Sequence, residues 1–235
     1  MLNKRLIWIF LAGLITLSAS AQQTHTISVD VKLVRPETGE VSKDSSRAAV
    51  WLVSLDHVGF RESAAKDKHY RMLQRDKHFE PTMLVIPVGG VVDFPNLDPW
   101  FHNVFSLYRG KRFDLGLYQA GSQRSVRFDK LGPSYLFCNI HPGMSAVILA
   151  VESDLFGISS KAGRVEITNV PPGRYELHVW HEQAAQESLD RLQRTIVVSG
   201  DRNLAPITIA VKQLEKGHKN KYGQDYDPDP LQPDY

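Results

Sequence analysis

The amino-acid sequence predicts an all-β fold made of two sandwiches. Short apolar stretches recur along the 235-residue chain, many of them alternating, as in the I-S-V-D-V-K-L pattern of 27–33. Turn-forming residues such as Gly89-Gly90 and Pro95-Asn96 separate them. Short strands with frequent turns are typical of sandwiches and barrels. Helical periodicity is weak, and 183–193 is the best helix candidate.

The expected strands fall into two groups on either side of residue 152. Each is a short run rich in β-branched or alternating apolar residues. A Pro171-Pro172-Gly173 turn separates two strands of the second group. In chain order, the expected strands are 27–33, 48–55, 84–88, 91–94, 125–128, 145–151, 163–170, 174–181, 195–198 and 206–211.

The first 21 residues have the pattern of a secretory signal peptide. Lys4 and Arg5 precede an uncharged apolar run, 6–17, and Ala19-Ser20-Ala21 then forms an A-x-A cleavage site. A membrane span needs about twenty apolar residues, so this run is too short for a stable anchor. We therefore expect cleavage after Ala21 and a periplasmic or secreted mature protein, with a buried N-terminal helix as the alternative.

The charge balance argues against a nucleic-acid partner. The whole chain has 28 basic and 26 acidic residues, and loss of Lys4 and Arg5 would make the two numbers equal. A nucleic-acid surface would require clustered Lys and Arg, which the sequence does not have.

One segment carries the donor atoms of a metal site. Residues 137–144 read F-C-N-I-H-P-G-M, which places Cys138, His141 and Met144 at C-x2-H-x2-M spacing, and His102 lies upstream. Cys138 is the only cysteine, whereas exported proteins usually pair their cysteines in disulfides. A lone thiol in such a protein therefore calls for another explanation.

The chemistry of this donor set favours copper. Thiolate stabilises Cu(I), imidazole suits both oxidation states, and a weak axial Met disfavours the tetragonal geometry that Cu(II) prefers. We predict one copper ion that cycles between Cu(I) and Cu(II). A zinc ion is one alternative, although Met is a poor zinc ligand. A buried free cysteine beside a histidine is the other.

These residues resemble the cupredoxins, the plastocyanin, amicyanin and pseudoazurin family, and the short loop looks most like amicyanin. F-E-P at 79–81, I-P-V-G at 86–89 and V-D-F-P-N at 92–96 extend the likeness over about 66–152. The resemblance implies a Greek-key sandwich and a copper site there. It also implies that Asn103 ties the two ligand segments together, which such sites need to hold their ligands. The ligands that it implies are His102, Cys138, His141 and Met144.

Two positions depart from the family pattern. Asn139 follows the cysteine where family members commonly have Ser or Thr, which puts the usual side-chain bridge to Asn103 in doubt. Ile140 stands where many short-loop members have Pro. Because Pro has no backbone N–H, Ile140 restores a donor near the sulfur of Cys138.

The stretch 163–181 contains N-V-P-P-G-R-Y and resembles the carboxypeptidase regulatory-like domain, a transthyretin-like sandwich in the carbohydrate-binding-like fold group. We therefore expect 24–65 and 153–211 to form one discontinuous small sandwich, with the cupredoxin-like part, 66–152, inserted into it or packed against its edge. Trp180 is the candidate for sugar contact, and core packing is its other explanation. The polar tail, 212–235, is expected to be disordered.

The predicted function is a periplasmic one-electron carrier. The resemblance implies that His141 is the electron exit towards a redox protein partner. An enzyme is not expected, because neither Phe137 nor Asn139 is the histidine that links a second copper centre in multicopper oxidases and copper nitrite reductases. The alternatives are a copper-handling protein without a redox partner, and a glycan- or envelope-binding module with a structural copper. His178 and His181, three apart on a strand, are not expected to share a metal.

Overall fold

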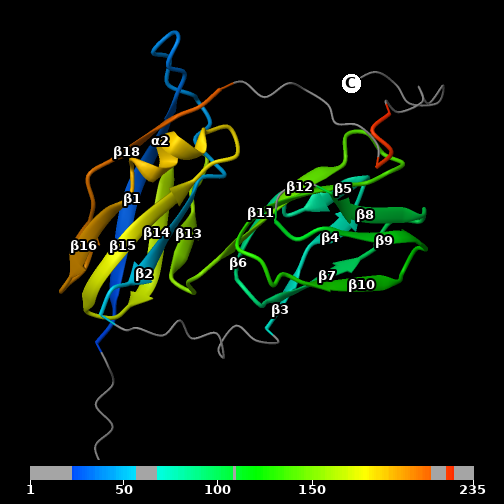
Figure 1. Ribbon diagram of the computed structural model, residues 1–235, viewed down its shortest axis with the longest axis horizontal. Coiled ribbons are helices and arrows are strands. Elements are labelled where there is room, and N and C mark those ends of the chain that lie inside the picture. The colour runs from blue at the N-terminus through cyan, green and yellow to red at the C-terminus, as the bar shows by residue number, and fades with distance from the viewer. Residues whose placement is uncertain (1–22, 57–67, 108–109, 213–220, 225–235) are drawn as a thin grey trace, which may run out of the picture.

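The computed structural model describes residues 23–56, 68–107, 110–212 and 221–224 and consists almost entirely of β-strands. They form two sandwiches that lie beside each other (Figure 1). The all-β prediction is confirmed. The expected signal peptide and most of the expected disordered tail lie outside the described residues. Within the described part, no helix is long and apolar enough to cross a membrane.

The first sandwich contains two facing sheets. In one, the central strand β1 pairs antiparallel with β14 and parallel with β17 and β18, and the other has the order β13-β2-β15-β16. Its elements are β1 (His25–Val34), β2 (Ala49–Ser54), β13 (Phe156–Ile158), β14 (Arg164–Val170), β15 (Gly173–Trp180), α2 (Gln186–Asp190), β16 (Arg194–Val198), β17 (Arg202–Asn203) and β18 (Ile207–Ala210).

The alternation in β1 explains which of its side chains face the second sheet. Ile27, Val29, Val31 and Leu33 are all buried in the core of this sandwich. Successive side chains of a strand point to opposite faces, so this spacing puts all four on the inner face. The expected helix is shorter than its pattern indicated: only Gln186–Asp190 is helical, and no side chain caps its start.

The second sandwich comprises a five-stranded sheet, β6-β12-β11-β8-β9, a three-stranded sheet, β10-β7-β3, and the β4–β5 hairpin. Its elements are β3 (His69–Arg71), β4 (Leu73–Arg75), β5 (His78–Glu80), β6 (Met83–Pro87), β7 (Val91–Pro95), β8 (His102–Ser106), β9 (Phe113–Tyr118), β10 (Gln123–Arg127), β11 (Gly132–Phe137) and β12 (Ser145–Val151).

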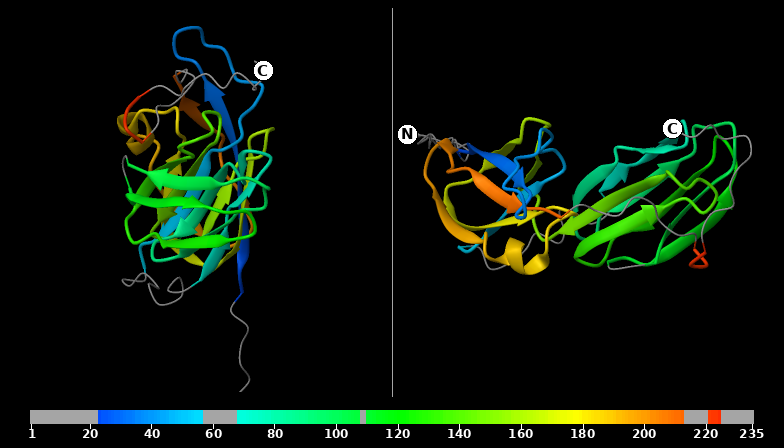
Figure 2. Two further views of the ribbon diagram at one scale, coloured as in Figure 1. Left: turned by 90° about the vertical axis from the view of Figure 1, so that its right-hand side faces the viewer. Right: turned by 90° about the horizontal axis from the view of Figure 1, so that it is seen from above.

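Strand β12 is buried on both of its faces. Val147 and Leu149 belong to the core of the first sandwich, whereas Ile148 and Ala150 belong to the core of the second. A strand buried on both sides needs a continuous apolar run, and S-A-V-I-L-A-V is such a run. Apolar packing therefore joins the two sandwiches, which Figure 2 shows end to end.

The topology brings together the two segments that carry the candidate ligands. Residues 138–144 connect β11 to β12, and we call this connection the ligand loop. Strand β8, which begins at His102, pairs with β11 through Phe105 and Phe137. Because Phe137 immediately precedes Cys138, this pairing places the start of the ligand loop next to β8.

Candidate metal centre

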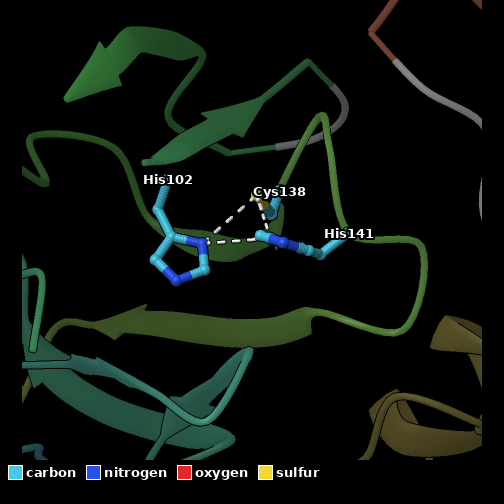
Figure 3. A group of neighbouring side chains, drawn as sticks. All are labelled: His102, Cys138 and His141. Carbon is cyan, nitrogen blue, oxygen red and sulfur yellow. Dashed lines mark hydrogen bonds between the residues drawn. The ribbon is translucent and has the colours of Figure 1, made fainter. Parts of the chain in front are cut away.

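Three of the four ligand candidates converge on one point. The sulfur of Cys138 lies 3.8 Å from His102 Nδ1 and 3.5 Å from His141 Nδ1, and the two Nδ1 atoms are 3.1 Å apart (Figure 3). Within the described residues, this is the group of His, Cys and acidic side chains that is arranged to hold a metal ion. Cys138 and His102 are completely buried, and His141 is partly exposed.

The triangle of donor atoms has the size of a metal site. The circle through three atoms at 3.1, 3.5 and 3.8 Å has a radius of about 2.0 Å. Bonds from a protein-bound metal such as zinc are about 2.0–2.1 Å to imidazole nitrogen and about 2.3 Å to thiolate sulfur. One ion therefore fits among the three atoms, and the mixed nitrogen and sulfur set suits copper.

Met144 closes the ligand loop. The Cys138 N–H donates to the Met144 carbonyl over 3.1 Å, and the Met144 N–H donates to the His141 carbonyl, also over 3.1 Å. The Met144 side chain is completely buried in the same apolar cluster as Cys138. The ligand loop is thus a compact turn, closed by two backbone hydrogen bonds, that carries three of the candidate ligands.

Backbone donors surround the sulfur. Burial raises the pKa of the Cys138 thiol, while hydrogen bonds from the backbone N–H groups of Asn103, Ile140 and His141 lower it. Such donors stabilise negative charge on sulfur, as a metal-bound thiolate requires. The Ile140 N–H, which a proline would lack, is one of these donors.

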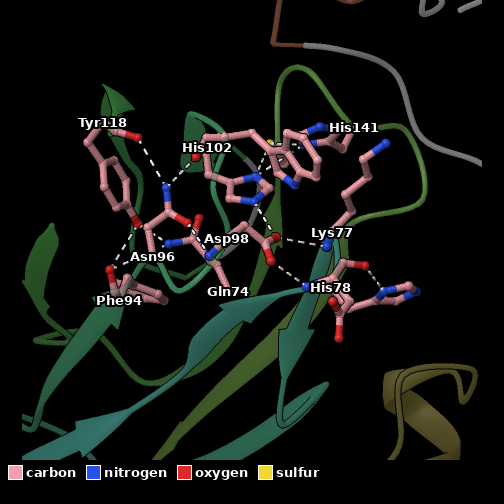
Figure 4. A network of polar contacts seen from close by, with 12 residues as sticks. Gln74, Lys77, His78, Phe94, Asn96, Asp98, His102, Tyr118 and His141 are labelled. Carbon is pink, nitrogen blue, oxygen red and sulfur yellow. Dashed lines mark hydrogen bonds and ion pairs between the residues drawn. The ribbon is translucent and has the colours of Figure 1, made fainter. Parts of the chain in front are cut away.

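A carboxylate that the sequence analysis did not single out orients His102. The Nε2–H of His102 donates to Asp98 Oδ2 over 2.7 Å, and both side chains are buried (Figure 4). This bond fixes the proton on Nε2, so the lone pair of Nδ1 faces Cys138 and His141. Metal-binding histidines commonly have such a partner on the other ring nitrogen.

The β4–β5 hairpin turn holds Asp98 in place. Asp76 and Lys77 form its two-residue loop, and both have positive φ angles, 52° and 59°. This conformation is typical of a type I′ turn. Here it aims both backbone N–H groups at the Asp98 carboxylate, at 2.6 and 2.9 Å. Asn96 adds to this support, because its Oδ1 accepts the Asp98 N–H over 3.0 Å.

These donors keep Asp98 charged despite its burial. Burial alone would raise the pKa of its carboxyl. The hydrogen bonds from the Lys77 N–H, the His102 ring and the Asp76 N–H outweigh that effect and hold the pKa below its usual value. A permanent negative charge therefore lies against the ring of one candidate ligand.

Asn103 links the two ligand segments through the backbone of Asn139. The Asn139 N–H donates to Asn103 Oδ1 over 3.0 Å, and Asn103 Nδ2 donates to Asp114 Oδ1 over 2.7 Å. The bridge thus needs no hydroxyl after the cysteine. The Asn139 side chain turns elsewhere, and its Oδ1 accepts the Lys221 N–H over 3.0 Å.

The other histidines singled out in the sequence lie apart from this centre, in the first sandwich. His178 stacks on Trp51 with ring centroids 5.1 Å apart, and His181 is buried just after β15. Trp180 is also buried, only 6% exposed, and belongs to the core. It therefore does not offer the exposed ring that sugar stacking would need.

Three residues that support the candidate ligand segments were not expected from the sequence: Asp98, Asp114 and Lys221. For Asp98, the available signal was an acidic residue four positions before a candidate ligand. No comparable signal exists for Lys221, because it contacts residues more than 80 positions away in the chain.

No protein-family model matches the chain, and no curated protein sequence matches it either. Several solved structures are similar to part of it. A copper-containing nitrite reductase from Thermus scotoductus is 26% identical over 35% of this chain and 22% of its own, with a TM-score of 0.34. A purple cupredoxin from Nitrosopumilus maritimus is 22% identical over 34% of this chain and 98% of its own, with a TM-score of 0.32. A reduced amicyanin mutant is 18% identical over 43% of this chain and 98% of its own, with a TM-score of 0.34. Each likeness involves less than half of this chain and does not establish its family.

Proposed function

We propose that this protein binds one copper ion and carries single electrons. The observation that carries the proposal is the convergence of His102 Nδ1, Cys138 Sγ and His141 Nδ1 within 4.8 Å of one another. Two imidazoles and a thiolate, with a thioether in the same loop, form the donor set of blue-copper electron-transfer sites. Met144 is proposed as the weak fourth ligand.

The surrounding residues hold this donor set in one arrangement. Asp98 fixes the tautomer and direction of His102, and backbone N–H groups stabilise the charge of the Cys138 thiolate. When bound, copper supplies a one-electron couple between Cu(I) and Cu(II). Because His102 and Cys138 are buried and hydrogen-bonded, they can move little between the two oxidation states of copper, which favours fast electron transfer.

His141 is the proposed route to a redox protein partner, because it is the one ligand of the converging three that reaches the surface. Exposed apolar side chains stand next to the ligands in the chain: Trp100 and Phe101 before His102, and Ile140 before His141. They are 52%, 56% and 42% exposed. A partner that covers them would bring its own redox centre close to His141.

The absorption spectrum of the Cu(II) protein tests the proposal. Charge transfer from the Cys138 thiolate should give an intense visible band, which Cys138→Ser should abolish. A colourless protein that still holds one Cu(II) ion would contradict thiolate ligation. A measured midpoint potential with fast self-exchange would then favour an electron carrier over a copper-handling protein.

Export is part of the proposal. The positive n-region, the short apolar run and the A-x-A site of residues 1–21 support it. Mass spectrometry of the mature protein should show a chain that begins at Gln22. A chain that retains Met1 would contradict a periplasmic or secreted location.

A further inference from the structure

A segment near the C-terminus, Lys221–Gln224, lies against the ligand loop. Its first residue makes two contacts with the second sandwich. The Lys221 N–H donates to Asn139 Oδ1 over 3.0 Å, and Lys221 Nζ lies 2.9 Å from Asp114 Oδ2. The Lys221 and Asp114 side chains are 25% and 33% exposed, so the ion pair is partly shielded from water.

These contacts complete a ring of hydrogen bonds behind the metal centre. Asn139 donates through its N–H to Asn103, Asn103 donates through its side chain to Asp114, and Lys221 connects Asp114 back to Asn139. Two members of the ring are neighbours of candidate ligands in the chain, since Asn103 follows His102 and Asn139 follows Cys138. Movement of either ligand segment would therefore strain the ring.

From this closed ring we infer that Lys221 is a positioning residue of the metal site, which it acts on through Asn139 and Asn103. The inference rests on the proposed copper site. By holding the two ligand segments against each other, Lys221 slows release of the metal and keeps the Cys138–metal geometry constant. Partners behind the ligands commonly have such an effect on metal affinity.

The residue after the cysteine fits this role. An Asn side chain offers a carbonyl oxygen that accepts a backbone N–H, while its own backbone N–H remains free to serve Asn103. Asn139 uses both groups in this way. The departure from Ser or Thr at this position is thereby explained as the docking point of the C-terminal segment.

Two described residues after β18 contact different sandwiches. The Lys212 N–H still donates to the Gln183 carbonyl in the first sandwich over 2.9 Å, whereas Lys221 lies at the ligand loop of the second. The Lys221 contacts therefore attach a residue that follows the last strand of the first sandwich to the second sandwich.

The test compares Lys221→Met with Lys111→Met in the full-length protein. Lys111 is a matched control: its Nζ lies 2.9 Å from Asp129, it is 26% exposed, and it belongs to the same sandwich. We expect Lys221→Met to speed copper loss to a chelator about threefold, because the stabilisation from one partly exposed ion pair corresponds to a change of about that factor. Lys111→Met should leave the rate unchanged, and Lys221→Arg should restore the parent rate. Removal of 221–235, which also removes the bond to Asn139, should speed copper loss about tenfold.

A second measurement needs no metal. Hydrogen exchange of the Asn139 N–H in the copper-free protein should become faster in Lys221→Met and faster still after removal of 221–235. Equal copper-loss and exchange rates in Lys221→Met, Lys111→Met and the parent would overturn the role of Lys221, even if the parent shows its visible band. A parent protein without that band would instead contradict the copper proposal, while the exchange result would still report on the ring.

Discussion

Replacing Asp98 by Asn should raise the midpoint potential of the proposed copper site. Asp98 accepts the Nε2–H of His102 over 2.7 Å, in a buried position. Its negative charge stabilises the more positive Cu(II) state more than the Cu(I) state. Loss of that charge therefore makes reduction easier. The hydrogen-bonding geometry at His102 can remain, because the Asn side chain still has one oxygen to accept from Nε2.

The size of the shift follows from the change in this hydrogen bond. Hydrogen bonds to charged groups contribute about 1.5–3 kcal/mol, and neutral ones about 0.5–1.5 kcal/mol. The difference is about 1–1.5 kcal/mol, and a one-electron couple shifts by about 59 mV for each 1.4 kcal/mol. If most of the difference falls on the oxidised state, the potential should rise by roughly 30–60 mV.

The same substitution should also cost stability. Asp98 accepts bonds from Asp76, Lys77 and His102, whereas Asn offers one oxygen and turns an NH2 group towards a donor. An unsatisfied buried group costs about 1–3 kcal/mol. Stability and potential therefore need separate measurements, by denaturant unfolding of the copper-free protein and by redox titration of the visible band.

Asp93→Asn is the control for Asp98→Asn. Asp93 is also a buried carboxylate that contacts a histidine, His69, at 2.9 Å, but it lies on β7 in the opposite sheet. It should lose stability without a change in potential. An unchanged or lowered potential in Asp98→Asn, or a shift of the same size in both variants, would refute the reasoning.

Three further predictions concern single residues. Ile140→Pro removes one N–H donor from the Cys138 sulfur, so the potential should fall by tens of millivolts in a redox titration, while Ile140→Val should leave it unchanged. Met144→Gln should retain copper but lower the potential, and metal analysis that shows an empty site would contradict a weak axial role. Burial, helped by the charge of Arg47, lowers the pKa of His181 from 6.5 to about 4, so the unfolded chain binds this proton more readily than the folded one. The free energy of unfolding should therefore drop by up to about 3 kcal/mol as the pH falls from 6.5 to 4, and His181→Gln should flatten that slope.

The all-β class and several of the strands could be predicted from the sequence because they depend on local patterns, whereas β8, β9 and β11 were not among the expected strands. The alternation in β1 and the double-sided apolar run of β12 are visible over seven residues each. The candidate metal centre could be proposed from the sequence for the same reason, since Cys138, His141 and Met144 share one short segment. Strand ends and the short helix α2 were less accurate, because packing rather than propensity determines where they stop.

The candidate donor set could be read from the sequence, because the choice of metal depends on ligand chemistry that His102, Cys138, His141 and Met144 already display. The tertiary structure alone decided what holds those donors. The turn of Asp76 and Lys77 around Asp98, and the contact of Lys221 with Asn139, join residues about 20 and more than 80 positions apart. Such contacts depend on strand register and on the path of the chain between sandwiches, and local periodicity carries no information about either.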